Sequence, residues 1–223
     1  MESRVPVVAI DGPSASGKGT IASRVAGALG FHYLESGALY RLVALVSLRT
    51  DERQETALAE IARTLPVVFQ KERIFMGDQE VTEDIRTEDC GVRASEVAPL
   101  AAVRRALLER QRAFRRAPGL VADGRDMGTV VFPDAELKVF LTARPEVRAE
   151  RRYKQLIEKG ISANLRALSR DLAERDARDE NRAVAPLVPA QDSQVLDSSA
   201  LSIDAVVERI VGWCKERNLV GRA

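Results

Sequence analysis

A glycine-rich segment near the start of the chain carries residue types that bind phosphate groups. Gly12, Gly17 and Lys18 fit the pattern G-x-x-x-x-G-K, which is typical of loops that hold the phosphates of a nucleotide. The glycines let the backbone turn its N–H groups toward an anion, and the lysine ammonium reaches the β- and γ-phosphates. The predicted nucleotide site consists of Gly12, Pro13, Ser14, Ala15, Ser16, Gly17, Lys18, Gly19 and Thr20.

The residue after the lysine departs from the general motif. That motif places Ser or Thr directly after Lys, whereas here Gly19 follows and Thr20 comes next. Thr20 is therefore a less direct candidate ligand for Mg²⁺ than its counterpart in a GTPase. The chain contains neither the N-K-x-D sequence of GTPases nor the LSGGQ sequence of transporter ATPases. These absences leave a small-molecule kinase or a nucleotide-binding module.

Arginines beside other polar residues indicate a second phosphate-bearing ligand, because phosphoryl transfer needs positive charge around both reactants. The sequence DGRDMGT at 123–129 directly follows an apolar run, and loops at the carboxyl ends of parallel strands are where ligands bind. A simple turn is the alternative for this segment. On a helix, Arg175, Asp179 and Arg182 would share one face. A solvated, salt-bridged helix is the alternative for these three residues.

Four segments, in order along the chain, resemble the bacterial cytidylate kinases, a branch of the nucleoside monophosphate kinases. They are GPSASGKGT, ESGALYR, ADGRDMGTVVFPDA and RDARDENRAVAPLVPA. The resemblance extends from about Val7 to the last predicted helix. Two positions depart from the family pattern: Glu35 stands where Asp is common, and Glu180 stands where many relatives carry a basic residue.

The resemblance implies phosphoryl transfer from ATP to CMP and dCMP with the help of Mg²⁺. Lys18, Arg125 and Arg182 would be catalytic, and Thr20 and Asp123 would belong to the shell of the metal. Ser95, Arg104 and Asp126 would read the cytosine. The full set of residues implied to bind CMP is Ser36, Arg41, Ser95, Arg104, Arg125, Asp126, Arg175, Asp179 and Arg182. Within it, Arg41 and Arg125 would bind the phosphate, Arg175 and Asp179 the sugar, and Arg182 the reacting phosphates.

Three other functions are open at this point. The acceptor could be UMP, AMP or another small molecule, or the chain could be a regulatory module that binds a nucleotide without turnover. A nucleic-acid-binding protein is the third alternative. The 34 Lys and Arg residues are balanced by 33 Asp and Glu, for a net charge of +1, which weighs against that alternative.

Apolar runs and helical patterns alternate along the chain. Residues 5–10, 120–124, 137–143 and 194–199 are predicted strands, and residues 20–30, 96–114 and 202–214 are predicted helices. In the last helix Ser202 is the expected N-cap, and Ile203, Val206, Val207, Ile210 and Trp213 are expected to face the core. This alternation predicts an α/β fold with a parallel sheet flanked by helices, which the resemblance identifies as the P-loop NTPase type.

Two stretches differ from this alternation. Residues 66–86 alternate apolar and polar residues around Gly77 and predict a small antiparallel sheet. Residues 144–182 are rich in Arg and Glu, and Gly160 is expected to separate two helices. The resemblance implies a single kinase domain over 1–223, with its core at 1–34, 100–148 and 166–223. It also implies an inserted monophosphate-binding subdomain at about 35–99 and a short lid at about 149–165.

Composition also supports expectations about the cellular setting. Cys90 and Cys214 are far apart and form no CxxC pair, so both are expected to be reduced. No signal peptide or apolar run of membrane-spanning length is recognisable. The only histidine, His32, is expected to be structural. We therefore expect a cytoplasmic protein without membrane or nucleic-acid partners, and the resemblance implies a monomer.

Overall fold

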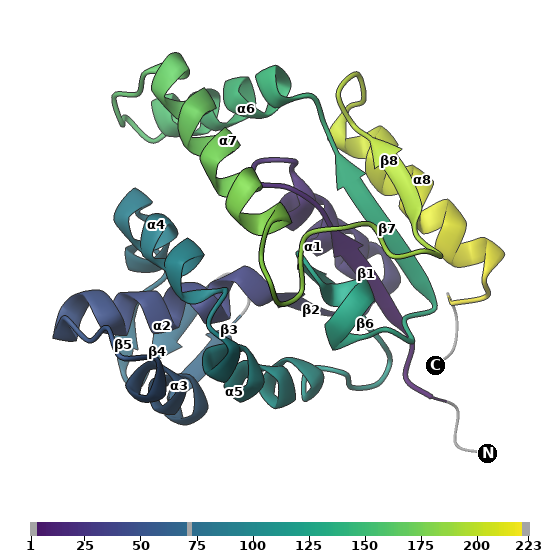
Figure 1. Cartoon of the computed structure of the whole chain (residues 1–223). Helices are drawn as coiled ribbons and strands as arrows, with labels where there is room; N and C mark the ends of the chain where they lie inside the picture. Colours follow the sequence, from purple (N-terminus) through teal and green to yellow (C-terminus); the bar gives the residue numbers. More distant parts are fainter. Residues whose placement is uncertain (1–3, 71–72, 220–223) are drawn as a thin grey trace. The chain divides into compact units, whose positions relative to one another are not determined.

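The computed structural model describes residues 4–70 and 73–219 of the 223-residue chain (Figure 1). The chain divides into two compact units. The first contains the chain up to Leu34 and again from Phe114 onward, and the second contains Glu35–Ala113.

The first unit is built on a five-stranded sheet in the order β2-β6-β1-β7-β8. Its strands are β1 (Val7–Asp11), β2 (His32–Glu35), β6 (Leu120–Gly124), β7 (Leu137–Thr142) and β8 (Gln194–Asp197). The pairs β1–β6, β1–β7 and β7–β8 are parallel. All residues of β1 and β6 are buried, as expected for central strands covered on both faces. The predicted α/β fold with a parallel sheet is confirmed.

Helix α1 (Lys18–Leu29) follows the glycine-rich loop and packs against α8 (Ile203–Glu216) and the sheet. Gly30 ends α1 at φ 67°, a left-handed conformation that glycine adopts without strain. Ser202 caps α8 as predicted, because its side chain accepts a hydrogen bond from the Ala205 N–H. Ile203 is 47% exposed rather than inward, since the buried stripe of α8 begins one turn later, at Val206.

In the second unit, the single helix predicted over 96–114 is wrong. The chain forms α4 (Glu88–Val97) and α5 (Ala101–Arg112) instead. Pro99 lies in the break, and its ring removes the N–H group that a continuous helix would need. Phe114, the last residue of that predicted helix, lies beyond the end of α5.

The remaining elements of the second unit are α2 (Ser36–Thr50), α3 (Glu55–Thr64), a 3₁₀ turn η1 (Asp84–Arg86) and a three-stranded antiparallel sheet. That sheet contains β3 (Val67–Gln70), β4 (Arg73–Met76) and β5 (Gln79–Glu80). It confirms the predicted small sheet, with Gly77 in the turn at φ 60°. Because α5 packs against α3, this unit extends to Ala113, beyond the boundary near residue 99 that the resemblance implies.

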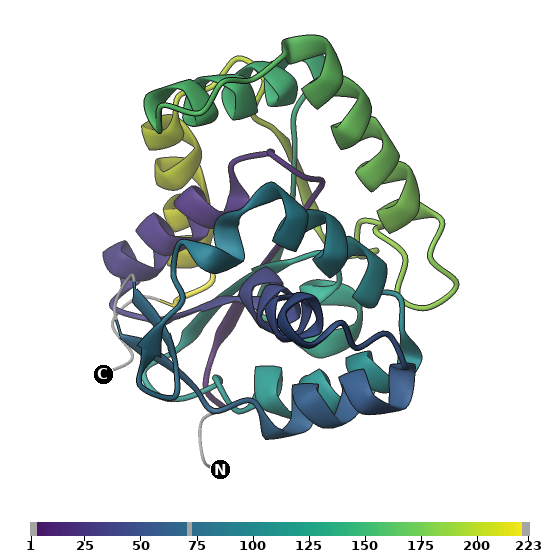
Figure 2. The same ribbon diagram turned by 90° about the vertical axis from the view of Figure 1, so that its left-hand side faces the viewer.

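Helices α6 (Pro145–Glu158) and α7 (Leu165–Glu180) of the first unit pack against each other (Figure 2). Gly160 lies between them at φ 73°, so the predicted division into two helices is confirmed. Arg182 lies beyond the end of α7, which corrects the expectation that it shares a helical face with Arg175 and Asp179. Among the described residues, no helix is long and apolar enough to span a membrane.

Candidate active site

The glycine-rich loop lies at the carboxyl edge of the parallel sheet. Asp11, the last residue of β1, pairs with Gly124, the last residue of β6, so the two loops that follow these strands start side by side. A Cβ at Gly12 would lie 2.0 Å from the Leu141 backbone oxygen of β7. Only glycine allows this close approach, and the sheet therefore holds the start of the loop tightly.

Lys18, the first residue of α1, is half-buried, and its Nζ donates a hydrogen bond to the Pro13 carbonyl oxygen at 3.1 Å. Burial and the charge of Arg125 lower the pKa of Lys18 to about 7, although Asp123 and Asp179 act in the opposite direction. Arg175 of α7 also lowers this pKa. A bound polyanion would offset the repulsion among these positive charges and favour the charged form of the Lys18 ammonium.

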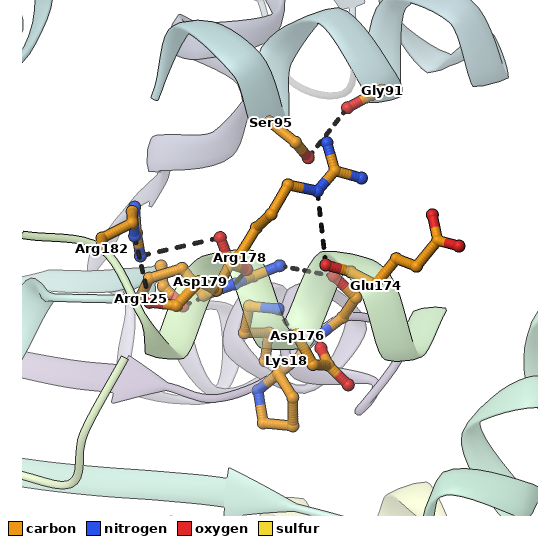
Figure 3. Close-up of polar contacts among 12 residues, drawn as sticks. Lys18, Gly91, Ser95, Arg125, Glu174, Asp176, Arg178, Asp179 and Arg182 are labelled. Atoms are coloured by element: carbon orange, nitrogen blue, oxygen red, sulfur yellow. Dashed lines mark hydrogen bonds and ion pairs between the residues drawn. The ribbon is translucent and has the colours of Figure 1, made fainter. Parts of the chain in front are cut away.

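An ion-pair cluster joins the DGRDMGT segment to the end of α7 (Figure 3). Arg125 donates from Nε to Asp179 Oδ2 at 2.7 Å and from Nη2 to Ser14 Oγ at 2.9 Å. Arg182 donates from Nε to the Asp179 carbonyl oxygen at 3.2 Å, and its Nη2 lies 3.8 Å from Asp179 Oδ1. Burial alone would raise the pKa of Asp179, but Arg125 and Arg182 lower it below its usual value. The structure thus gathers Lys18, Arg125, Asp179 and Arg182 at one place.

Asp123 is the candidate ligand for a metal ion. Its Oδ1 accepts a hydrogen bond from Tyr33 Oη at 2.9 Å, and a Cβ at Gly19 would lie 4.0 Å from its Oδ2. Its carboxylate therefore lies against the loop segment that carries Thr20, and Mg²⁺ prefers such oxygen ligands. No group of three metal-binding His, Cys, Asp or Glu side chains occurs in residues 4–70 and 73–219. These residues fit an Mg²⁺ ion that keeps waters and phosphate oxygens as its other ligands.

Asp11 is a buried residue of the candidate site that no sequence motif indicated. Its two carboxylate oxygens accept hydrogen bonds from the Met127 and Gly128 N–H groups, each at 2.8 Å. These groups begin a π-helical turn, η2 (Met127–Val131), whose N-cap is the buried Asp126. Burial raises the pKa of Asp11 to about 6 despite these hydrogen bonds. Asp11 thus ties the end of β1 to the turn that positions Asp126.

Two arginines of α6 also contact the loop and were not predicted. Arg148 and Arg151 donate hydrogen bonds to the carbonyl oxygens of Ser14 and Ser16, at 3.0 Å and 3.1 Å. Both lie in the stretch dense in Arg and Glu. Their spacing of three would have placed them on one helical face, but such spacing is also typical of a solvated face.

Four predicted substrate residues lie in the second unit. Ser36 is buried at the start of α2, and Arg41 donates from Nη1 to the Ile85 carbonyl oxygen at 2.7 Å. Ser95 Oγ donates to the Gly91 carbonyl oxygen at 3.2 Å, as Figure 3 shows. Arg104 donates to the Ala98 carbonyl oxygen at 3.3 Å, and its guanidinium lies over the Tyr40 ring. These four residues form a set distinct from the cluster of the first unit.

The chain is similar to known proteins over nearly its whole length. A family model described as cytidylate kinase matches residues 8–216. A cytidylate kinase of Paraburkholderia phymatum is 59% identical over 212 residues, which cover 94% of this chain and 93% of that relative. A cytidylate kinase of Ralstonia pickettii is 57% identical over 213 residues, covering 95% and 92% of the two chains. A solved sugar kinase from Janibacter has a TM-score of 0.50 at 16% identity, covers 97% and 98% of the two chains, and shows a similar fold.

Proposed function

Because the chain belongs to the cytidylate kinase family of kinases, which phosphorylate nucleoside monophosphates, we propose that it uses ATP to phosphorylate CMP and dCMP. The observation that carries the proposal is the cluster of Lys18, Arg125 and Arg182 beside the glycine-rich loop. This cluster supplies the positive charge that two phosphate-bearing substrates require.

The reaction is ATP + CMP → ADP + CDP. An oxygen of the CMP phosphate attacks the γ-phosphorus of ATP in line, and the bond from that phosphorus to the β–γ bridging oxygen breaks. The ADP oxygen takes the electron pair. The protein needs no nucleophilic side chain, because positioning and neutralisation of charge lower the barrier.

Each residue of the cluster has a distinct role in this proposal. Lys18 binds the β- and γ-phosphates, and Arg125 binds the phosphate of CMP. Arg182 lies across the transferring group, where its charge acts most strongly in the transition state. Arg175 and Asp179 bond the sugar. The Arg125–Asp179 ion pair fixes both side chains, which lowers the cost of ordering them when substrates bind.

Mg²⁺, when bound by Asp123 and Thr20, would neutralise negative charge on the phosphates of ATP. Tyr33 orients the Asp123 carboxylate through its 2.9 Å hydrogen bond. Tyr33 Oη also lies 3.4 Å from the Gly19 carbonyl oxygen. Tyr33 thus holds the carboxylate against the loop.

Two segments have proposed substrate-binding roles beyond the cluster. In the second unit, Ser36 and Arg41 bind CMP and its phosphate, and Ser95 and Arg104 read the base. Residues 149–165 form a lid that excludes water, since water would otherwise hydrolyse ATP. We also propose that the protein is a monomer in the cytoplasm. Light scattering on the purified protein tests whether it is a monomer.

A panel of phosphate acceptors tests the proposed substrate. With ATP and Mg²⁺ present, ADP formation should have the highest kcat/KM for CMP and dCMP, and much lower values for UMP and AMP. A preference for AMP or UMP would contradict the proposal. Lys18→Ala should abolish turnover with the fold retained, with a loss of at least about 10³-fold. If the wild-type protein shows no turnover with any acceptor of the panel, the result would favour a regulatory nucleotide-binding module.

A further inference from the structure

Two arginines of α6 bind the outside of the glycine-rich loop through its carbonyl groups. Arg148 Nη1 donates to the Ser14 carbonyl oxygen at 3.0 Å, and Arg151 Nη1 donates to the Ser16 carbonyl oxygen at 3.1 Å. The two arginines are three residues apart and lie on one face of the helix. Alternate carbonyl groups of the loop are thereby turned toward α6.

Arg148 is itself fixed by further contacts. Its Nε donates to the Ala143 carbonyl oxygen at 3.0 Å, and its Nη1 forms an ion pair with Asp176 of α7. Asp176 Oδ1 in turn accepts a hydrogen bond from the Ser14 N–H at 3.2 Å. Both charged side chains are buried. One ion pair therefore holds the N–H and the C=O of the same loop residue.

Because the peptide bond is planar, the hydrogen bonds to the Ser14 and Ser16 carbonyl groups also fix the direction of the N–H group that follows each of them. In a trans peptide, the C=O of one residue and the N–H of the following residue point in opposite directions. The Ala15 N–H must therefore point away from Arg148, and the Gly17 N–H away from Arg151. Ala15 has a φ of 57°, a left-handed conformation that is costly for a residue with a Cβ. Such a conformation persists only where the surroundings impose it.

The same N–H groups have no acceptor within the described part of the chain. No hydrogen bond from the N–H of Ala15 or Gly17 to any described residue is formed. They lie in the loop that leads to Lys18, and the positively charged Arg125 donates from Nη2 to Ser14 Oγ of the same loop at 2.9 Å. Oriented N–H donors beside such positive charge form a concave site for an anion.

We propose that Arg148, held by Asp176, is a positioning residue that orients the N–H groups of the loop toward the phosphates of the bound nucleotide. The proposal rests on the function proposed above, in which the loop binds ATP. Arg148 contacts neither substrate, and it acts only through the Ser14 peptide group. Arg151 acts in the same way on the Ser16 peptide group.

Arg148→Lys is the main test, because lysine keeps the charge but cannot form three hydrogen bonds in a fixed planar arrangement. The KM for ATP and the dissociation constant for ADP should rise by roughly tenfold, the effect expected when one or two hydrogen bonds to a charged group lose their geometry. The KM for CMP should change less than about twofold. ADP titration calorimetry and steady-state kinetics measure these constants.

Two further variants keep the test interpretable. Removing one partner of a buried ion pair leaves an unpaired charge, so the double variant Arg148→Met with Asp176→Leu removes both charges together. It should show the same loss of ADP affinity. Arg115→Lys is the matched control, since Arg115 donates to the Val5 carbonyl oxygen at 2.7 Å and to Asp134 at 2.6 Å. Thermal unfolding establishes that each variant is folded.

The possible results distinguish a failure of the positioning role of Arg148 from a failure of the proposed nucleotide site. Weaker ADP binding in the Arg148 variants, with wild-type affinity in Arg115→Lys, supports the positioning role. A folded Arg148→Lys variant with wild-type ADP affinity and wild-type KM for ATP overturns it. An equal loss in Arg115→Lys also overturns it, because the effect would then be general destabilisation. If the wild-type protein binds no ADP, the assignment of the loop as a nucleotide site fails instead.

Discussion

Lys18 is the residue whose protonation should change most when a nucleotide binds. Burial and the charge of Arg125 lower its pKa to about 7, so at pH 8 about 90% of Lys18 is neutral. Bound phosphates favour the ammonium and raise the pKa again. ADP binding at pH 8 should therefore take up close to one proton, and binding at pH 6 should take up almost none.

Calorimetric titration in two buffers of different ionisation enthalpy measures this uptake. Lys18→Arg is the control, because arginine stays charged throughout this pH range. The uptake at pH 8 should disappear in that variant while ADP still binds. Equal uptake by the two proteins would show that another group accepts the proton.

Asp126 allows a test of how the base is recognised. A carboxylate only accepts hydrogen bonds, so it suits the amino group of cytosine and opposes the carbonyl oxygen that uracil has there. Sites built on such polar pairing reject a mismatched analogue by up to about 10⁴-fold. Asp126→Ala should lower kcat/KM for CMP strongly and for UMP little. An equal fall for both substrates would assign Asp126 a structural or metal-related role instead.

At the scale of elements, the glycines of the segment β1–loop–α1 differ in how closely other atoms surround them. A Cβ at Gly12 would lie 2.0 Å from the Leu141 backbone oxygen, whereas a Cβ at Gly27 of α1 would meet nothing within 4 Å. Gly12→Ala should therefore lower the free energy of unfolding by more than about 2 kcal/mol. Gly27→Ala should raise it by about 0.5–1 kcal/mol, since alanine favours the helix.

Urea unfolding of the two alanine variants measures both changes. Because the same substitution is made at Gly12 and at Gly27, the comparison separates the effect of close packing from the general effect of replacing glycine. A stable Gly12→Ala variant would mean that the start of the loop moves away from β7 without much cost.

At the scale of the whole molecule, the balance of charge determines which polyanions can bind. With 34 basic and 33 acidic residues, the chain has little net attraction for a nucleic-acid backbone, whose binding depends on many neutralised phosphates. In about 150 mM salt, single-stranded RNA should neither shift in a gel with the protein nor inhibit CMP phosphorylation. Salt-sensitive inhibition by RNA would contradict this and would indicate an RNA-binding surface.

Local features of the fold were predictable from the sequence because their causes lie within a few residues. The Ser202 cap, the left-handed Gly30, the turn at Gly77 and the buried strands all follow from backbone freedom, capping and apolar runs. The break at Pro99 follows from the same chemistry, although the helical pattern on its two sides led to the prediction of one helix over 96–114. The motifs likewise predicted the loop and Arg125 as binding residues, since a phosphate site needs those residue types, and the roles of these residues stay predictions.

Only the tertiary structure showed which charged side chains contact the loop and the turn beside it. Ser14 and its partners Arg148 and Asp176 are 134 and 162 residues apart in sequence, and Asp11 bonds an N–H group 116 residues away. No local pattern distinguishes these residues from the many arginines and carboxylates that face solvent, because helical spacing is the same in both cases. These contacts form because the parallel sheet brings the ends of β1 and β6 together and because α6 and α7 pack over the loop. Burial then makes each unpaired charge costly.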